Sequence, residues 1–136
     1  MSARPFVDTN VLLYLLSIDA GKAARAEQVL AGRIVLSVQV LNEFADVARR
    51  KYALDWRGLR QVLADIEHFA KVQPLTVGTH ELGLTLCERY QLALYDALIA
   101  AAAIEAGCTT LCSEDFQDGQ VLEGTLTIQN PFNDRA

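Results

Sequence analysis

Short apolar segments alternate with longer helical ones along this chain, and that alternation limits the folds open to it. Four segments have the length and composition of buried strands: residues 4–7, 34–36, 109–113 and 126–129. Residues 72–75 are expected to form a short edge strand, because they include Pro74. Strands that alternate with helices favour an α/β sandwich with a mainly parallel sheet.

Six segments between these strands are expected to be helical. They cover about residues 10–17, 22–31, 37–51, 55–71, 76–90 and 94–106. Thr9 or Asn10 is the expected N-cap of the first helix and Ser37 that of the third, whereas the fifth begins at Thr76 or Thr79. The last helix is almost wholly apolar, so it should be buried on most of its sides.

The chain has 136 residues, which suits one domain spanning residues 1–136. Its net charge of −5 argues against a protein that coats nucleic acid without specificity. No apolar signal segment opens the sequence, and the longest apolar run, residues 97–104, is far shorter than the ~20 residues that cross a bilayer. Three cysteines in apolar surroundings indicate reduced thiols. We therefore expect a cytoplasmic protein with no membrane partner.

Four acidic residues stand at the ends or edges of apolar segments: Asp8, Glu43, Asp96 and Asp115. Asp8 and Asp115 follow predicted strands, and ligands of parallel sheets bind beyond the carboxyl ends of the strands. Glu43 and Asp96 lie on helices that can face the same edge of the sheet. Two carboxylates roughly 4 Å apart repel by roughly 4 kcal/mol at an effective dielectric constant near 20, so a cluster of four requires a cation. The pattern predicts a divalent-metal site for chemistry on a phosphate.

Each acid also has an ordinary structural explanation. Asp8 and Asp115 are compatible with turn or capping positions. Asp96 is compatible with a first-turn acid that the helix dipole favours. Glu43 is compatible with the polar border of an amphipathic helix. The metal site is favoured because all four acids share one pattern.

Five of the twelve basic residues fall within twelve positions: Arg49, Arg50, Lys51, Arg57 and Arg60. They form either a solvated helix end and loop or a contact for phosphate groups beside the acidic site. Trp56 lies among them and either packs against the protein or a partner, or stacks on a base.

Four blocks of the sequence resemble the PIN-domain ribonucleases, and most closely the bacterial VapC-type toxins. They are, in order, residues 7–13 (VDTNVLL), 40–44 (VLNEF), 95–102 (YDALIAAA) and 111–116 (LCSEDF). The resemblance implies a small α/β/α sandwich that binds Mg²⁺ or Mn²⁺ and hydrolyses phosphodiester bonds in single-stranded or loop RNA. It also implies a cognate antitoxin protein that blocks the site, and a homodimer.

By this resemblance the four acids carry over as catalytic, metal-binding residues. Asp8 and Asp96 are expected to hold the principal ion, while Glu43 and Asp115 hold water molecules or a second ion. One of the latter two helps to take the proton from the attacking water. Neither histidine of the chain is placed for this task.

The polar neighbours of the acids carry over more weakly, as support: Thr9, Asn10 and Ser113. The family often has a second acid two positions after the one that Asp115 matches, and this chain has Gln117 there. The sequence leaves open whether Asp115 acts alone or is assisted by Glu114 or Asp118.

Two other functions are compatible with parts of the pattern. One is a non-catalytic RNA- or protein-binding module with the PIN fold, although the acid in every block argues against it. The other is a phosphatase with an aspartyl nucleophile, since Asp8 ends the first strand. That chemistry needs a second Asp two residues later, where this chain has Asn10.

Overall fold

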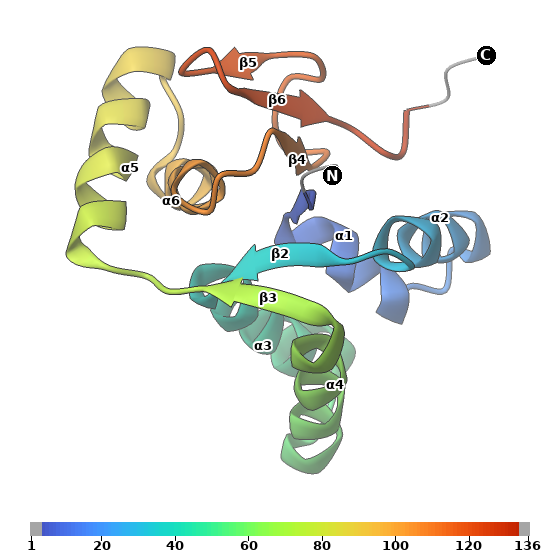
Figure 1. Ribbon diagram of the computed structural model, residues 1–136. Helices are drawn as coiled ribbons and strands as arrows, with labels where there is room; N and C mark the ends of the chain where they lie inside the picture. Colours follow the sequence, from blue (N-terminus) through green and yellow to red (C-terminus); the bar gives the residue numbers. More distant parts are fainter. Residues whose placement is uncertain (1–3, 134–136) are drawn as a thin grey trace.

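The computed structural model describes residues 4–133, and within them a six-stranded sheet has the order β3-β2-β1-β4-β6-β5 (Figure 1). The strands are β1 (Phe6–Val7), β2 (Ile34–Ser37), β3 (Ala70–Gln73), β4 (Thr110–Cys112), β5 (Val121–Leu122) and β6 (Leu126–Gln129). Neighbouring strands run parallel except for β5, which pairs antiparallel with β6. The expectation of a mainly parallel sheet is confirmed.

Helices cover both faces of the sheet. They are α1 (Thr9–Leu13), the 3₁₀ turn η1 (Tyr14–Leu16), α2 (Ala20–Leu30), α3 (Val38–Tyr52), α4 (Trp56–Phe69), α5 (Val77–Tyr90) and α6 (Leu94–Glu105). The crossovers from β1 to β2 and from β2 to β3 step in one direction, whereas that from β3 to β4 steps back. Because such crossovers are right-handed, α5 and α6 lie opposite α1 and α2, as the ribbon shows (Figure 1). The three-layer α/β/α architecture is therefore confirmed.

Helix α6 is the most deeply buried helix, as its composition predicts. Four successive alanines, Ala100–Ala103, are all fully buried where α6 packs between α5 and the sheet. Small side chains allow this close approach, so the helix has little room for larger ones.

Ala101→Leu is expected to destabilise the fold by roughly 1–3 kcal/mol, because extra methylenes overpack a filled core. Urea unfolding followed by circular dichroism measures the effect. The matched control is Ala64→Leu on the exposed face of α4, where the change should stay within about 0.5 kcal/mol. Equal midpoints for the two variants would contradict this packing of α6.

Several element ends are where the sequence predicts them, and others are not. Ser37 caps α3, because its Oγ accepts a hydrogen bond from the Val40 backbone N–H at 3.3 Å. Thr76, not Thr79, caps α5 through a capping box. The prediction of Thr9 or Asn10 as the cap of α1 is wrong, because Asp8 Oδ1 accepts from the Thr9 N–H at 2.7 Å.

Two strand predictions need correction. The edge strand lies at Ala70–Gln73, two residues before the predicted residues 72–75, and pairs with β2 through all four of its residues. Strand β5 has only two residues and was not predicted. Within residues 4–133, no helix combines the length and apolar character needed to cross a membrane.

Candidate functional site

The candidate site begins where β1 and β4 end side by side in the centre of the sheet. Val7 pairs with Cys112, and the Asp8 backbone N–H donates to the Cys112 carbonyl at 3.0 Å. The residues that follow the two strands, Asp8 and Ser113, therefore lie next to each other. Ser113 Oγ donates a hydrogen bond to Asp8 Oδ2 at 2.7 Å. Both side chains are almost completely buried. Parallel pairing alone thus places an acid and a hydroxyl at the carboxyl edge of the sheet.

Asn10 connects Asp8 to Asp115. Its Nδ2 atom lies 3.3 Å from Asp8 Oδ2 and 3.0 Å from Asp115 Oδ2. The same nitrogen lies 3.3 Å from Ser113 Oγ. One amide group therefore contacts carboxylates that are separated by more than a hundred residues in the chain.

Glu43 joins this network from helix α3. Thr9 Oγ1 donates to Glu43 Oε1 at 3.3 Å, while the Thr9 backbone N–H is bound to Asp8. Gln39, one helical turn earlier, donates from Nε2 to Glu43 Oε2 at 2.7 Å. Glu43 and Asp115 also line one cavity of about 610 Å³, together with Thr9 and Asn10.

Asp96 lies in the first turn of α6 and is half-buried. Burial raises the pKa of its carboxyl group, and the charges of Asp115 and Glu43 raise it further. All of these effects disfavour the ionised form. Asp96 is therefore near enough to both acids to be repelled by them.

Asp8 is more deeply buried than Asp96. Burial raises the pKa of Asp8 from 3.8 to about 7, against the lowering effect of hydrogen bonds from Ser113 and Thr9. The charges of Asp115 and Asp96 raise it further. Every charged group that shifts the pKa of Asp8 or Asp96 is another carboxylate. The four acids thus lie within electrostatic reach of one another at this edge of the sheet.

The donor set fits a hard divalent cation. Within residues 4–133, no three His, Cys, Asp or Glu side chains form a closed set of ligands around one point. An open set of carboxylate oxygens beside a cavity nevertheless suits Mg²⁺, which uses one or two carboxylates and keeps several water molecules. A cation would also reverse the repulsion that raises the pKa values of Asp8 and Asp96.

The sequence profile of the PIN domain family matches residues 6–117. The chain belongs to the PIN domain family. No curated protein sequence matches it. The resemblance of the four sequence blocks to this family is confirmed.

Solved structures with the same fold include bacterial toxins. VapC20 of Mycobacterium tuberculosis, described as a sarcin-ricin loop cleaving toxin, is 20% identical over 88% of this chain and 97% of its own, with a TM-score of 0.69. A toxin–antitoxin complex from Klebsiella pneumoniae is 20% identical over 97% and 100%, with a TM-score of 0.73. VapBC2 of Rickettsia felis, bound to a promoter DNA fragment, is 18% identical over 94% and 98%, with a TM-score of 0.68. At these identities the likeness establishes the fold alone.

In this PIN domain, Glu114 faces away from the other acids. Its carboxylate accepts a hydrogen bond from the Tyr14 hydroxyl, and Lys22 Nζ lies 3.7 Å from Glu114 Oε2. Lys22 also donates to the Tyr14 hydroxyl at 2.8 Å, and the Tyr14 ring packs against Phe132 with centroids 4.6 Å apart. This cluster anchors the segment that carries Asp115.

Asp118 also contacts groups outside the acidic site. It accepts hydrogen bonds from the Asn130 backbone N–H at 2.9 Å and from Asn133 Nδ2 at 3.0 Å. It thereby supports the chain after β6.

Gln39 is a residue of the site that the sequence alone did not indicate. Its side chain is only 8% exposed and points at Glu43. The available signal was its spacing four residues before an acid on a predicted helix, which places both on one face.

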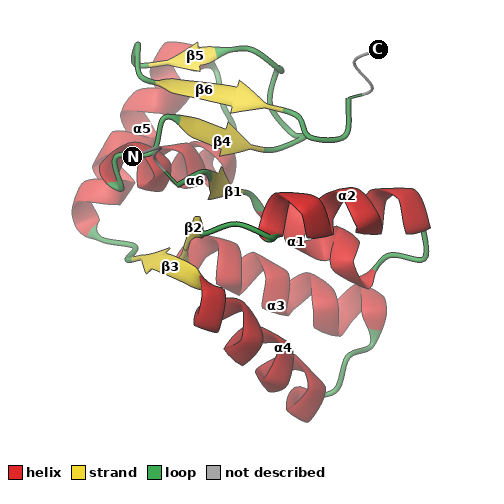
Figure 2. Cartoon of the chain, turned by 45° about the vertical axis from the view of Figure 1, so that its right-hand side comes forward, coloured by secondary structure: helices red, strands yellow, loops and turns green. Residues whose placement is uncertain are grey.

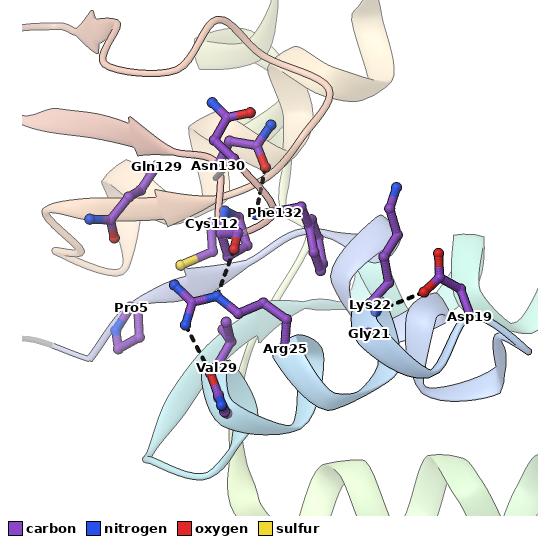
Figure 3. Close-up of a pocket in the computed structure, with 13 residues that line it drawn as sticks. Pro5, Asp19, Gly21, Lys22, Arg25, Val29, Cys112, Gln129, Asn130 and Phe132 are labelled. Carbon is purple, nitrogen blue, oxygen red and sulfur yellow. Dashed lines mark hydrogen bonds between the residues drawn. The ribbon is translucent and has the colours of Figure 1, made fainter. Parts of the chain in front are cut away.

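The PIN domain has a larger cavity elsewhere, of about 820 Å³, between α2 and the end of β6 (Figure 3). None of the four acids lines it. The Arg25 side chain lines this cavity, and its Nε donates a hydrogen bond to the Pro131 carbonyl at 2.7 Å. Burial raises the pKa of the Cys112 thiol in its wall to about 11, so this thiol is not an activated nucleophile.

Proposed function

We propose that this PIN domain is a divalent-metal-dependent endoribonuclease, and that it is the toxin of a VapBC-type pair. The observation that carries the proposal is the proximity of Asp8, Glu43, Asp96 and Asp115, where burial and then the charges of neighbouring carboxylates raise the pKa of Asp8 and of Asp96. Like charges gathered in a partly buried site are costly to the fold and are typical of functional sites.

Asp8 and Asp96 are the proposed ligands of the principal ion, because burial and neighbouring carboxylates oppose the ionised form of both. Bound Mg²⁺ or Mn²⁺ supplies an activated water and neutralises charge on the phosphate. Glu43 and Asp115 border the open cavity, so they can hold water molecules or a second ion and accept the proton of the attacking water.

Asn10, Thr9 and Ser113 hold these carboxylates in place. Each donates a hydrogen bond to at least one of the four acids. The Glu114 carboxylate is bound to Tyr14, and Asp118 is bound to the segment after β6. Asp115 is therefore favoured as the acid that this part of the chain contributes to the metal site.

Digestion of a single-stranded RNA with and without EDTA tests the activity. Cleavage that EDTA stops, and that Mg²⁺ or Mn²⁺ restores, is expected. RNA binding without cleavage at any metal concentration would instead support the non-catalytic module. Cleavage that persists after complete chelation would remove the metal from the proposal.

The proposed partners are a cognate antitoxin and a second copy of this chain, with the reaction taking place in the cytoplasm. Support comes from the related folds, one of which is a toxin–antitoxin complex. Copurification from the native host should recover a small inhibitory protein, and light scattering should give twice the monomer mass. Recovery of an active monomer without such a protein would contradict both.

A further inference from the structure

The acidic cavity continues along helix α3 towards its C-terminal end. Asp46, Val47 and Arg50 line the same cavity as Glu43 and Asp115. On α3 these residues are spaced three, four and seven positions after Glu43, so they form one face of the helix. The open side of the site therefore leads to the end of α3.

A basic and aromatic surface begins there, which we call the α3–α4 corner. It consists of Arg49, Arg50, Lys51, Trp56, Arg57 and Arg60, all exposed. Helices α3 and α4 pack against each other and are joined by a short loop (Figure 2). The corner therefore combines the end of one helix with the start of the next.

Trp56 has one ring face occupied and much of its surface open. The guanidinium carbon of Arg49 lies 4.0 Å from the ring centroid, and Arg49 Nη1 donates to the Leu54 carbonyl at 2.9 Å. Trp56 is still 62% exposed. An aromatic ring that is fixed by a cation on one face is a ready platform for stacking a base.

The charges of the corner are largely uncompensated. Arg50 pairs with Asp46 at 3.2 Å, but both side chains are about 70% exposed, so the pair is worth little. Within residues 4–133, the other four basic residues make no ion pair. The chain has a net charge of −5, so the basic α3–α4 corner is a local exception, and its positive charge can bind phosphate groups.

We infer that the α3–α4 corner binds a single-stranded segment of the RNA that enters the acidic cavity. A base stacks on Trp56, and phosphates of the same strand contact Arg57 and Arg60. Glu43 and Tyr52, at the end of α3, are nine residues apart, or roughly 14 Å along the helix. The stacked base is therefore a few nucleotides from the bond that is cut. This inference rests on the proposed ribonuclease function.

The test measures the affinity of a labelled single-stranded RNA for the Asp96→Asn protein in EDTA, where no cleavage occurs. Adding Trp56→Ala is expected to weaken binding by roughly 5- to 150-fold, the range for losing one stacked base. Trp56→Phe should restore most of the affinity. Arg57→Gln with Arg60→Gln should reduce the slope of log affinity against log salt by about 1.4.

Arg33→Gln is the matched control, because Arg33 is exposed and lies before β2, away from the corner. It should bind RNA like the parent. If Trp56→Ala and the double arginine variant also bind like the parent, the inference is wrong. Loss of binding to a partner protein, with RNA affinity unchanged, would assign the corner to that protein and overturn the inference.

The two proposals fail differently. If the unmodified chain cuts RNA with Mg²⁺ but the Trp56 and arginine variants bind RNA normally, only the assignment of the corner is wrong. If the unmodified chain neither cuts nor binds RNA, both proposals are wrong.

Discussion

Asp96→Asn is expected to lower the rate of RNA cleavage by roughly 100- to 1000-fold, the range for removing one electrostatic stabiliser of a transition state. Asparagine keeps the shape of the side chain but removes the negative charge that is proposed to hold the metal. The charge of Asp96 is opposed by burial, Asp115 and Glu43, so its removal relieves repulsion in the fold. Single-turnover digestion at saturating Mg²⁺ measures the effect on the chemical step.

Glu67→Gln is the control for this substitution. It also removes one negative charge, but from the exposed surface of α4, and should cleave at the rate of the unmodified chain. Thermal unfolding of both variants should differ from that of the unmodified chain by less than about 1 kcal/mol. Asp96→Asn protein that cleaves normally would remove Asp96 from the site.

The second large effect is a dependence of the free energy of unfolding on pH, through the carboxyl group of Asp8. Burial, Asp115 and Asp96 raise the pKa of Asp8 from 3.8 to about 7 in the folded chain. Between these values the folded state keeps a proton that the unfolded chain has released, so stability falls as pH rises from about 4 to 7. The loss reaches at most roughly 4 kcal/mol in metal-free protein. Urea unfolding in EDTA at pH 5 and pH 8 measures the part of this loss that lies above pH 5, roughly 3 kcal/mol.

Asp8→Asn should remove this part of the pH dependence, because its amide does not titrate. The variant is expected to be the more stable protein at pH 8 in EDTA and to be inactive. Mg²⁺ or Mn²⁺ at a hundred times its dissociation constant should stabilise the unmodified chain by about 2.7 kcal/mol. The same addition should not stabilise Asp8→Asn. If the free energy of unfolding depended on pH in the same way for the two proteins, Asp8 would not be held in a repulsive site.

The sequence was sufficient to predict the order of the elements other than β5, because strand and helix periods differ and caps such as Ser37 are distinctive. It was insufficient at Asp8, where three successive residues are all good N-caps and only the backbone conformation selects one. Strand β5 is two residues long, and pairing with β6 defines it rather than local propensity. Short elements of this kind depend on tertiary contacts.

The proximity of Asp8 and Asp115 could be predicted because parallel strands end at one edge. The supporting contacts could not. Asn10 contacts Asp115, which is 105 residues away in the chain, and Tyr14 contacts Glu114, which is 100 residues away. Such pairs leave no periodic signal. For the same reason the sequence left the role of Glu114 open, and the contact with Tyr14 provides a structural role for it.

Crystals soaked in Mn²⁺ and measured at the manganese absorption edge would test most directly whether these acids hold a metal. An anomalous peak is expected within coordinating distance of Asp8 and Asp96, with Glu43 and Asp115 on its open side. Asp8→Asn crystals treated in the same way should lack it. Manganese bound only at other positions, or absent from the four carboxylates at millimolar concentration, would contradict the metal-dependent site on which the proposed function rests.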